Sequence, residues 1–229
     1  MQAIILAGGR GKRLDPYTRV LPKPLIPIGE EPIAEILVGQ LRSAGADDIV
    51  MCLGYLADLI KAYFQDGAWH GVPIRYVTET SPLGTAGPLK NIEGLADNFL
   101  VINGDEFTTL NFETLYRHHL SMGADMTIAV QKKSQSSSLG VLEIKDGYVI
   151  AYREKPVMDY WVSMGIYVLN KRAVELIPDN EAFDIPDLVQ ILLHQNARIV
   201  SFESQDLWFD IGTMEDLDRA RKAKLTTNE

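Results

Sequence analysis

The chain has 229 residues, of which 46% are hydrophobic and 23% charged, and its formal net charge is −9. This composition is ordinary for a globular protein, and the length suits one sizeable α/β domain with a full core. The negative charge argues against nucleic acid or an anionic membrane as a main partner, and no apolar run approaches membrane-spanning length.

Strand and helix patterns alternate along the first half of the chain. Strands are expected at 3–7, 48–52, 74–78, 98–103 and 126–131, and helices at 33–44, 56–64, 87–95 and 112–122. Four β–α repeats in succession predict an α/β fold, a Rossmann-like three-layer sandwich with a mostly parallel central sheet. The loops that follow the strands then share one edge of the sheet, where ligands bind in such folds.

The pattern changes after residue 131. Residues 135–138 form a polar stretch, 139–152 predict a hairpin that turns at Asp146-Gly147, and 160–169 and 198–203 predict strands. Helices are expected at 185–193 and from Thr213 to about 223, the second opened by a capping-box pattern and followed by a frayed tail at 225–229. No linker interrupts the chain, so we expect a single domain over 1–229.

The first predicted strand ends in a glycine-rich turn that carries several cations. The turn spans residues 8–13 and contains Arg10, Lys12 and Arg13, and Lys23 follows between two prolines. Glycines leave backbone N–H groups open to a ligand, and the cations add positive charge to the same short segment. The segment therefore predicts a site for a strongly anionic ligand such as a triphosphate.

Two familiar phosphate loops are excluded here. A Walker loop requires Ser or Thr after its Gly-Lys pair, but Arg13 follows Gly11-Lys12, and Leu6 stands at the place of the first glycine. A dinucleotide fingerprint requires a third glycine where this chain has Leu14. An ordinary solvated turn stays open as an interpretation of the two leading glycines taken alone.

The span from Leu6 to Leu25 resembles the signature of the sugar-nucleotide pyrophosphorylases, nucleotidyltransferases that join a sugar 1-phosphate to a nucleotide. One departure is Lys12, where the family usually has Thr. The resemblance runs from Gln2 to about Ala223 and implies the nucleotide-diphospho-sugar transferase type of fold. It also implies a nucleotide-binding half at 1–131 and a sugar-binding half at 132–229.

The resemblance assigns roles to the first loop. Arg13 would stabilise the leaving pyrophosphate and Lys23 would neutralise the α-phosphate, so both are candidate catalytic residues. The nucleotide-binding residues implied along the chain are Leu6, Ala7, Gly8, Gly9, Gly11, Glu79, Gly84, Thr85, Gly87 and Asp105.

Two carboxylates are candidates for a Mg²⁺ site. Asp105 follows the apolar run of 98–103 after Gly104, and Asp210 follows another apolar run late in the chain. Mg²⁺ typically binds through one or two carboxylates and completes its coordination with phosphate and water. Either residue alone is more often a turn residue or a helix cap. The resemblance favours metal binding by both, and Glu106 is left open between a further ligand and a solvated neighbour.

A candidate nucleobase loop follows the strand at 74–78. The run Leu83–Leu89 is a simple loop and helix start, or alternatively a base-reading segment whose glycines permit close approach. It resembles the loop of GDP-mannose pyrophosphorylases. Glu79 could then accept hydrogen bonds from guanine N1–H and N2–H.

The sugar side rests on weaker matches. The run Glu154-Lys155-Pro156 resembles a family element in which Glu contacts sugar hydroxyls and Lys the sugar phosphate, although an ordinary charged strand end is the simpler interpretation. Gly140 matches half of a sugar-contacting pair, and Ser163 stands where the family usually has Asn. These residues form the expected sugar-phosphate site.

We expect Mg²⁺-dependent transfer of a nucleotidyl group from GTP to a mannose-like or heptose 1-phosphate. The alternatives are UTP, CTP or dTTP with N-acetylmuramate or glucose 1-phosphate, a choline-phosphate type of acceptor, or a non-catalytic nucleotide-sensing subunit. The length leads us to expect no C-terminal β-helix of the kind that longer relatives carry. A single cysteine, Cys52, in an apolar run favours a reducing, cytoplasmic compartment, and a homo-oligomer is left open.

Overall fold

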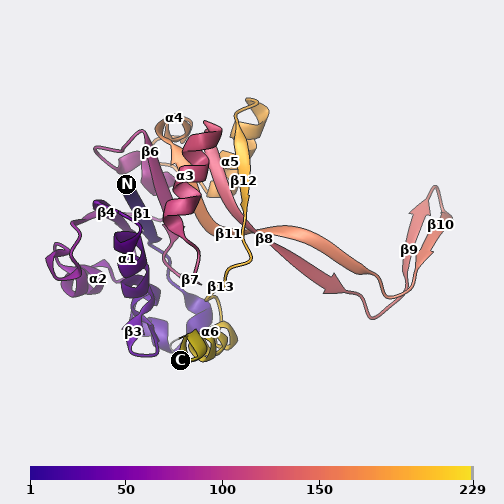
Figure 1. Ribbon diagram of the computed structural model, residues 1–229, viewed down its shortest axis with the longest axis horizontal. Coiled ribbons are helices and arrows are strands. Elements are labelled where there is room, and N and C mark those ends of the chain that lie inside the picture. Colours follow the sequence, from indigo (N-terminus) through magenta and orange to yellow (C-terminus); the bar gives the residue numbers. More distant parts are fainter. Residues whose placement is uncertain (228–229) are drawn as a thin grey trace.

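The computed structural model describes residues 1–227, and residues 228–229 of the expected domain lie outside the described part (Figure 1). A seven-stranded sheet in the order β12-β8-β11-β6-β1-β4-β5 forms its centre. Only β11 runs antiparallel to its neighbours, which confirms the mostly parallel α/β sheet. The strands are β1 Gln2–Ala7, β4 Asp48–Leu53, β5 Ile74–Thr78, β6 Asn98–Asn103, β8 Met126–Ser136, β11 Val157–Asn170 and β12 Ile199–Glu203.

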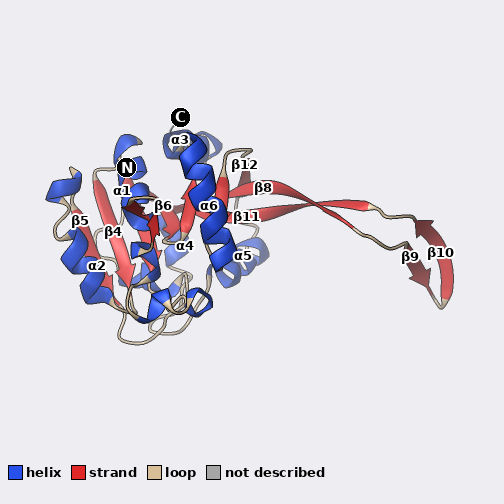
Figure 2. Ribbon diagram, turned by 90° about the horizontal axis from the view of Figure 1, so that it is seen from below, coloured by secondary structure: helices blue, strands red, loops and turns tan. Residues whose placement is uncertain are grey.

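Helices cover both faces of this sheet (Figure 2). Because successive side chains of a strand point to opposite faces, Ile5 lies in one hydrophobic core and Ile4 in the other. The first core is covered by α1 Ile33–Ser43, α2 Ala57–Phe64, α3 Phe112–Met122 and α6 Met214–Thr227, and the second by α4 Lys171–Val174 and α5 Ile185–His194. None of these described helices is long and apolar enough to cross a membrane.

Three local expectations are corrected. The segment expected as a helix at 87–95 forms only a 3₁₀ turn, η5 Gly87–Asn91, and Gly94 further along it has φ +68°, a left-handed conformation that cannot continue a right-handed helix. Helix α6 begins at the expected capping box, in which Thr213 and Asp216 bond each other reciprocally, and continues past the expected end near 223 to Thr227, while residues 228–229 of the expected frayed tail lie outside the described residues. Four short strands were not expected: β2 Pro27–Ile28, β3 Glu31–Pro32, β7 Glu106–Thr108 and β13 Trp208–Asp210.

Two strands run far beyond the sheet. We expected strands that end at 131 and begin again at 160, but β8 continues to Ser136 and β11 starts at Val157. They pair out to Val157–Ser136 and carry the expected hairpin, β9 Val141–Lys145 and β10 Tyr148–Arg153. We call residues 131–162 the arm and residues 137–156 its distal hairpin. Figures 1 and 2 show the arm projecting from the body of the domain.

A buried histidine gives the fold a pH dependence. His119 is 1% exposed, with Nδ1 at 2.8 Å from the Thr127 hydroxyl and Nε2 at 3.0 Å from Asn98 Oδ1. Burial lowers the pKa of His119 from 6.5 to about 4. Between these values the unfolded chain binds a proton that the folded chain does not, so lowering the pH favours unfolding.

We therefore expect His119 to reduce the free energy of unfolding by on the order of 3 kcal/mol as the pH falls from 6.5 to 4. Denaturant unfolding across this range should show a shallower decline for His119→Gln than for the wild type. His194→Gln, at an exposed position on α5, is the matched control. Equal declines in the His119→Gln variant and the wild type would contradict the assignment.

Candidate active site

The loop after β1 displays its cations because a few side chains anchor it. It folds as three successive 3₁₀ turns, η1 Lys12–Leu14, η2 Tyr17–Arg19 and η3 Lys23–Leu25. Leu14 and Thr18 are buried, and the Thr18 hydroxyl lies 3.1 Å from the carbonyl oxygen of Gly11. Arg10, Lys12 and Arg13, which precede these anchors, are exposed. The buried anchors thus fix the backbone of the loop and leave its cationic side chains exposed to solvent.

Three carboxylates meet at the edge of the sheet. Glu106 in β7 pairs directly with Asp210 in β13, and the amide of Ile211 donates to the carbonyl of Asp105 at 3.1 Å. Carboxylate oxygens of Asp105, Glu106 and Asp210 all lie within 4.8 Å of one another. The short β7–β13 pair therefore brings the two expected metal ligands together with a third acid.

Both expected catalytic cations face this acidic cluster. Lys23, only 8% exposed, forms an ion pair with Asp105. The guanidinium of Arg13 lies against the backbone of Gly212, where a Cβ would come within 3.1 Å of both terminal nitrogens. Burial and the negative charge of Asp105 raise the pKa of Asp210, while Lys23 and Arg13 oppose that shift. The site is thus an acidic cluster that two cations partly neutralise.

Glu106 is not a solvated neighbour. It is 2% exposed and accepts hydrogen bonds from Trp208 Nε1 at 2.7 Å and Asn103 Nδ2 at 3.3 Å. Burial, with the charges of Asp105 and Asp210, raises its pKa well above the usual value. Gly165 has φ +70°, and a Cβ there would lie 2.1 Å from Glu106 Oε1. The sequence carried little signal for this residue, because the three-residue strand β7 is too short to show a period.

A pocket of about 320 Å³ opens beside the cluster, within the size range of small-molecule sites. Its lining includes most of the expected nucleotide-binding residues, namely Leu6, Gly8, Gly9, Glu79, Gly84, Thr85 and Asp105, together with Cys52, Pro82, Pro88 and Asn103. Ala7 and Gly87 are buried behind it, and Gly11 precedes η1 and accepts from the Leu14 amide at 2.9 Å. A second hollow, of about 420 Å³, contains the cations Arg10, Lys12 and Arg19.

Glu79 and Thr85, which line the pocket of about 320 Å³, form hydrogen bonds with other parts of the chain. Glu79 Oε2 accepts from the Leu83 amide at 2.9 Å, and burial raises the pKa of Glu79. The Thr85 hydroxyl accepts from the Ile185 amide at 2.8 Å and lies 3.1 Å from Asp184 Oδ1. The Thr85 amide also donates to Asp184 Oδ1, at 2.8 Å, so the side chain and the amide of Thr85 both tie the loop to the start of α5.

The expected sugar-phosphate residues are split between two places. Ser163 lies at the foot of the arm, where its hydroxyl is 3.1 Å from Tyr167 Oη. Gly140, Glu154 and Lys155 lie on the distal hairpin, where the Tyr152 ring packs directly against Gly140 and its hydroxyl bonds Glu154. The structure does not bring these three residues to the acidic cluster of their own chain (Figure 1).

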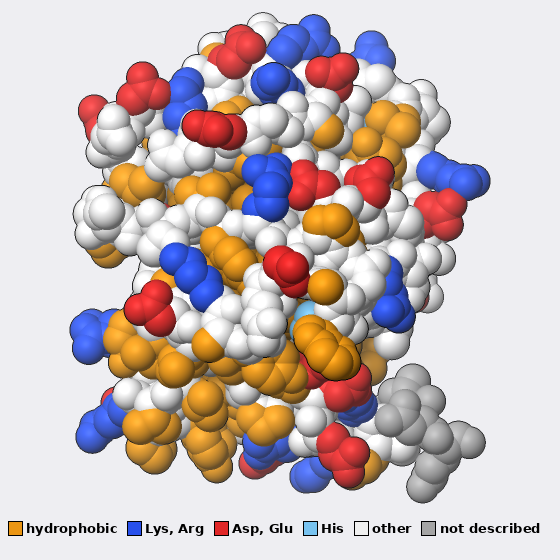
Figure 3. Space-filling model, turned by 90° about the vertical axis from the view of Figure 1, so that its left-hand side faces the viewer, with side chains coloured by type: hydrophobic (Ala, Val, Ile, Leu, Met, Phe, Trp, Pro, Cys, Tyr) orange, Lys and Arg blue, Asp and Glu red, His pale blue; other side chains and the backbone are white. Residues whose placement is uncertain are grey.

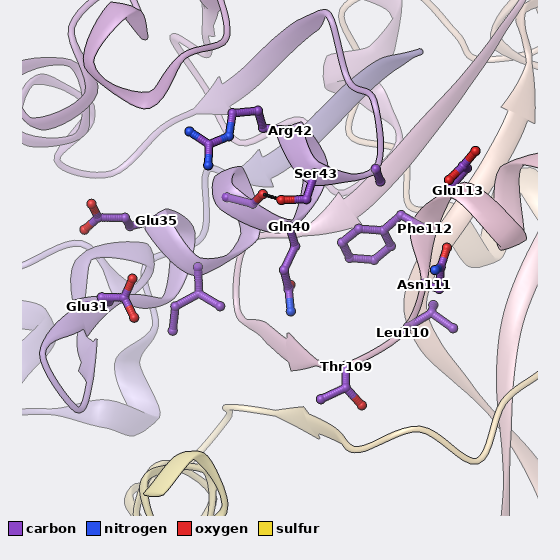
Figure 4. A pocket seen from close by; sticks show the side chains of 13 residues that line it. Glu31, Glu35, Gln40, Arg42, Ser43, Thr109, Leu110, Asn111, Phe112 and Glu113 are labelled. Atoms are coloured by element: carbon purple, nitrogen blue, oxygen red, sulfur yellow. Dashed lines mark hydrogen bonds between the residues drawn. The ribbon is translucent and has the colours of Figure 1, made fainter. Parts of the chain in front are cut away.

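Another hollow, of about 490 Å³, lies between α1 and residues 109–113 (Figure 4). The Gln40 amide points across it and donates to the Thr108 carbonyl at 2.6 Å. Its acids are Glu31, Glu35 and Glu113, against the single cation Arg42. This balance repels a triphosphate, and none of the expected site residues lines the hollow.

Comparison with known proteins decides what the cationic loop and acidic cluster belong to. The family described as nucleotidyl transferase matches residues 2–227. The chain belongs to the nucleotidyl transferase family. The resemblance expected from the first loop is thereby confirmed, and the chain is an enzyme of the nucleotidyltransferase class.

Named relatives of this nucleotidyltransferase differ in base. D-glycero-alpha-D-manno-heptose 1-phosphate guanylyltransferase of Aneurinibacillus thermoaerophilus is 32% identical over 225 residues, covering 97% of each chain. UTP–glucose-1-phosphate uridylyltransferase of Synechocystis is 34% identical, but the chain spans only 64% of its length. A crystal structure of HddC from Yersinia pseudotuberculosis complexed with GMP-PN superposes with a TM-score of 0.75 at 27% identity, covering 97% of this chain and 99% of that one.

Proposed function

We propose that this nucleotidyltransferase transfers GMP from GTP to a mannose-like or heptose 1-phosphate, giving a GDP-sugar and pyrophosphate. The observation that carries the proposal is the meeting of Lys23 and Arg13 with the carboxylates of Asp105 and Asp210 beside the Glu79 pocket. Residues 1–131 would bind the nucleotide and 132–229 the sugar. The free, buried Cys52 is consistent with a cytoplasmic enzyme.

The reaction requires no nucleophile from the protein. A phosphate oxygen of the sugar 1-phosphate attacks the α-phosphorus of GTP, a new P–O bond forms, and the bond to the β-phosphate oxygen breaks to release pyrophosphate. Lys23 would neutralise charge that develops on the α-phosphate, and Arg13 the leaving pyrophosphate. Such steps depend mainly on positioning and charge stabilisation.

The acidic cluster fits a hard divalent cation such as Mg²⁺. All of its donors are carboxylate oxygens, and burial together with their mutual repulsion raises the pKa of Glu106 and Asp210. Asp105 and Asp210 would hold the ion, with Glu106 buried behind them. When bound, the ion supplies positive charge for the phosphate oxygens.

The choice of base rests on Glu79 and on the relatives. Its carboxylate lines the pocket opposite Gly8 and would accept from guanine N1–H and N2–H. The A. thermoaerophilus relative is named for guanylyl transfer to a manno-heptose 1-phosphate, and the HddC structure for its complex with GMP-PN. The uridylyltransferase relative keeps UTP as the competing candidate.

The test is a matrix of ATP, GTP, CTP, UTP and dTTP against a panel of sugar 1-phosphates, with pyrophosphate release measured in Mg²⁺ and in EDTA. We expect the highest kcat/KM with GTP and a mannose-like or heptose 1-phosphate, and no release in EDTA. A higher kcat/KM with another nucleotide would overturn the base assignment. Nucleotide binding without pyrophosphate release from any pair would overturn the proposed reaction.

Glu79→Gln is expected to raise the KM for GTP by about 10–100-fold, because one amide oxygen can still accept from Leu83 while the amide NH₂ meets the guanine donors. The KM for any slower nucleotide without those donors should change less. Glu93→Gln, at an exposed position, is the matched control. An unchanged KM for GTP would remove Glu79 from base recognition.

A further inference from the structure

Exposed large hydrophobic side chains are concentrated on the distal hairpin and its arm. Twelve of the 21 exposed large hydrophobic side chains of the described residues lie between 139 and 161. Tyr148 is 76% exposed, and Trp161, near the foot of the arm, is 50% exposed. On the face turned away from the arm, charged side chains of both signs are interspersed among hydrophobic ones (Figure 3). The arm is therefore the surface that most requires a cover.

The distal hairpin cannot by itself bury these exposed apolar side chains. An isolated two-stranded hairpin is marginally stable in water, and no hydrogen bond or ion pair among the described residues joins 137–156 to the body. Twelve side chains with roughly 100 Å² exposed apiece offer on the order of 1,000 Å² per chain. Two copies covering each other would bury an area typical of a stable interface.

The reaction site of a single chain is also incomplete on its sugar side. Lys155 is the expected partner of the sugar phosphate, yet it lies between β10 and β11, where the distal hairpin joins the long strands of the arm. Seven strand pairs, from Ser163–Val130 to Val157–Ser136, separate it from the body by roughly 20 Å. Folding Lys155 back onto its own site would release these pairs, whereas a second chain can reach the site with all of them intact.

A groove of about 1,080 Å³ lies at the foot of the arm and fits such a hairpin. Trp161, Trp208 and Phe209 give it an aromatic lining, and Lys133 and Arg219 stack on the rings of Trp208 and Phe209 at 5.1 and 5.4 Å. This lining matches an apolar hairpin that carries a carboxylate. Trp208 also bonds Glu106, so the groove borders the acidic cluster.

The geometry points to a two-fold dimer in which the arms lie antiparallel, so that the distal hairpin of one chain occupies the groove of the other. Two-fold symmetry places each arm tip at the foot of the partner arm. Lys155 of one chain then binds the sugar phosphate at the Lys23 and Asp105 of the other, and Glu154 the sugar hydroxyls. The identity of the ligand at this shared site rests on the proposed function, whereas the exchange of arms between the two chains does not.

Heterodimers of Lys23→Ala and Lys155→Ala chains test the exchange. Each variant alone should lose about 10²–10³-fold in turnover. A heterodimer purified through two different tags should recover about half of the wild-type activity, because one of its two sites then has both lysines. If both lysines of a site come from one chain, the heterodimer stays inactive, and this result overturns the exchange while wild-type activity upholds the proposed function.

Cross-linking supplies a readout independent of catalysis. One tagged chain carries Lys155→Cys and the other Lys133→Cys, and Cys52 is buried with a pKa raised to about 12, so it does not compete. A short bismaleimide should join the two chains covalently. The exchange is wrong if they stay separate while a doubly substituted single chain links internally, and this holds even if the wild type proves inactive.

The mass in solution completes the test. Light scattering should give the mass of two chains for the wild type and of one chain for Tyr148→Asp/Ile150→Asp, which should also lose turnover. Leu120→Asp and Leu193→Asp, at apolar positions 48% and 52% exposed on α3 and α5, should leave the dimer intact. A wild type that is monomeric and fully active would overturn the inference.

Discussion

Replacing Lys23 by alanine is expected to lower the rate of pyrophosphate release by about 10²–10³-fold while the chain stays folded. Within residues 1–227, Lys23 is the one cation that forms an ion pair with the acidic cluster, and it is almost fully buried there. A buried, pre-positioned charge stabilises developing phosphate charge far more than a solvated one does. The loss should therefore appear in kcat as well as in kcat/KM.

The matched control is Lys12→Ala, which removes an exposed cation from the same loop. It should reduce turnover much less. Thermal unfolding of both variants separates a chemical effect from a folding defect. Near-normal kcat in a folded Lys23→Ala protein would show that the mechanism is wrong.

Asp210→Asn is expected to reduce Mg²⁺-dependent turnover by on the order of 10²-fold or more. It should also weaken Mg²⁺ binding in calorimetric titrations. The substitution preserves shape but removes one of the three clustered charges. Because its surroundings raise the pKa of Asp210, its charge is disfavoured in the folded protein without metal. The variant should thus unfold at the same or a higher denaturant concentration in EDTA.

Loss of turnover and of Mg²⁺ affinity without loss of stability would distinguish a metal ligand from a residue that only supports the fold. A structural residue would lose stability and activity together. Asp218→Asn, at an exposed position on α6, controls for a change in net charge and should retain Mg²⁺-dependent turnover. Unchanged Mg²⁺ affinity in Asp210→Asn would remove this residue from the metal site.

The order of strands and helices in the body was predictable because local periodicity produces it. The runs at 98–103 and 112–122 match β6 and α3 to the residue. The observed elements depart from the predicted ones where long-range contacts override the local pattern. The segment at 87–95 has helical periodicity, yet it forms only a 3₁₀ turn, and the amides of Ala86 and Gly87 tie its start to Phe183, nearly 100 residues away.

The candidate site was predictable where one short segment carries it. Arg13, Lys23 and the glycines lie in a single loop after β1, and Asp105 directly follows β6. Glu106 could not be assigned, because its burial depends on Trp208 and Gly165, which lie on other elements of the fold. The position of Lys155 could not be predicted either, because it depends on how far β8 and β11 extend, and this length is set by their pairing with each other.

The sequence by itself determined the class of fold and the cationic loop, because hydrophobic period and motif spacing are local properties, and its resemblance to a family indicated Asp105 and Asp210 as the expected metal ligands. Only the tertiary structure decided that Lys23 pairs with Asp105, that Glu106 joins the acidic cluster, and that Lys155 lies where the distal hairpin joins the arm. Pairing between distant strands places these groups, and a single sequence records no contact between positions a hundred residues apart.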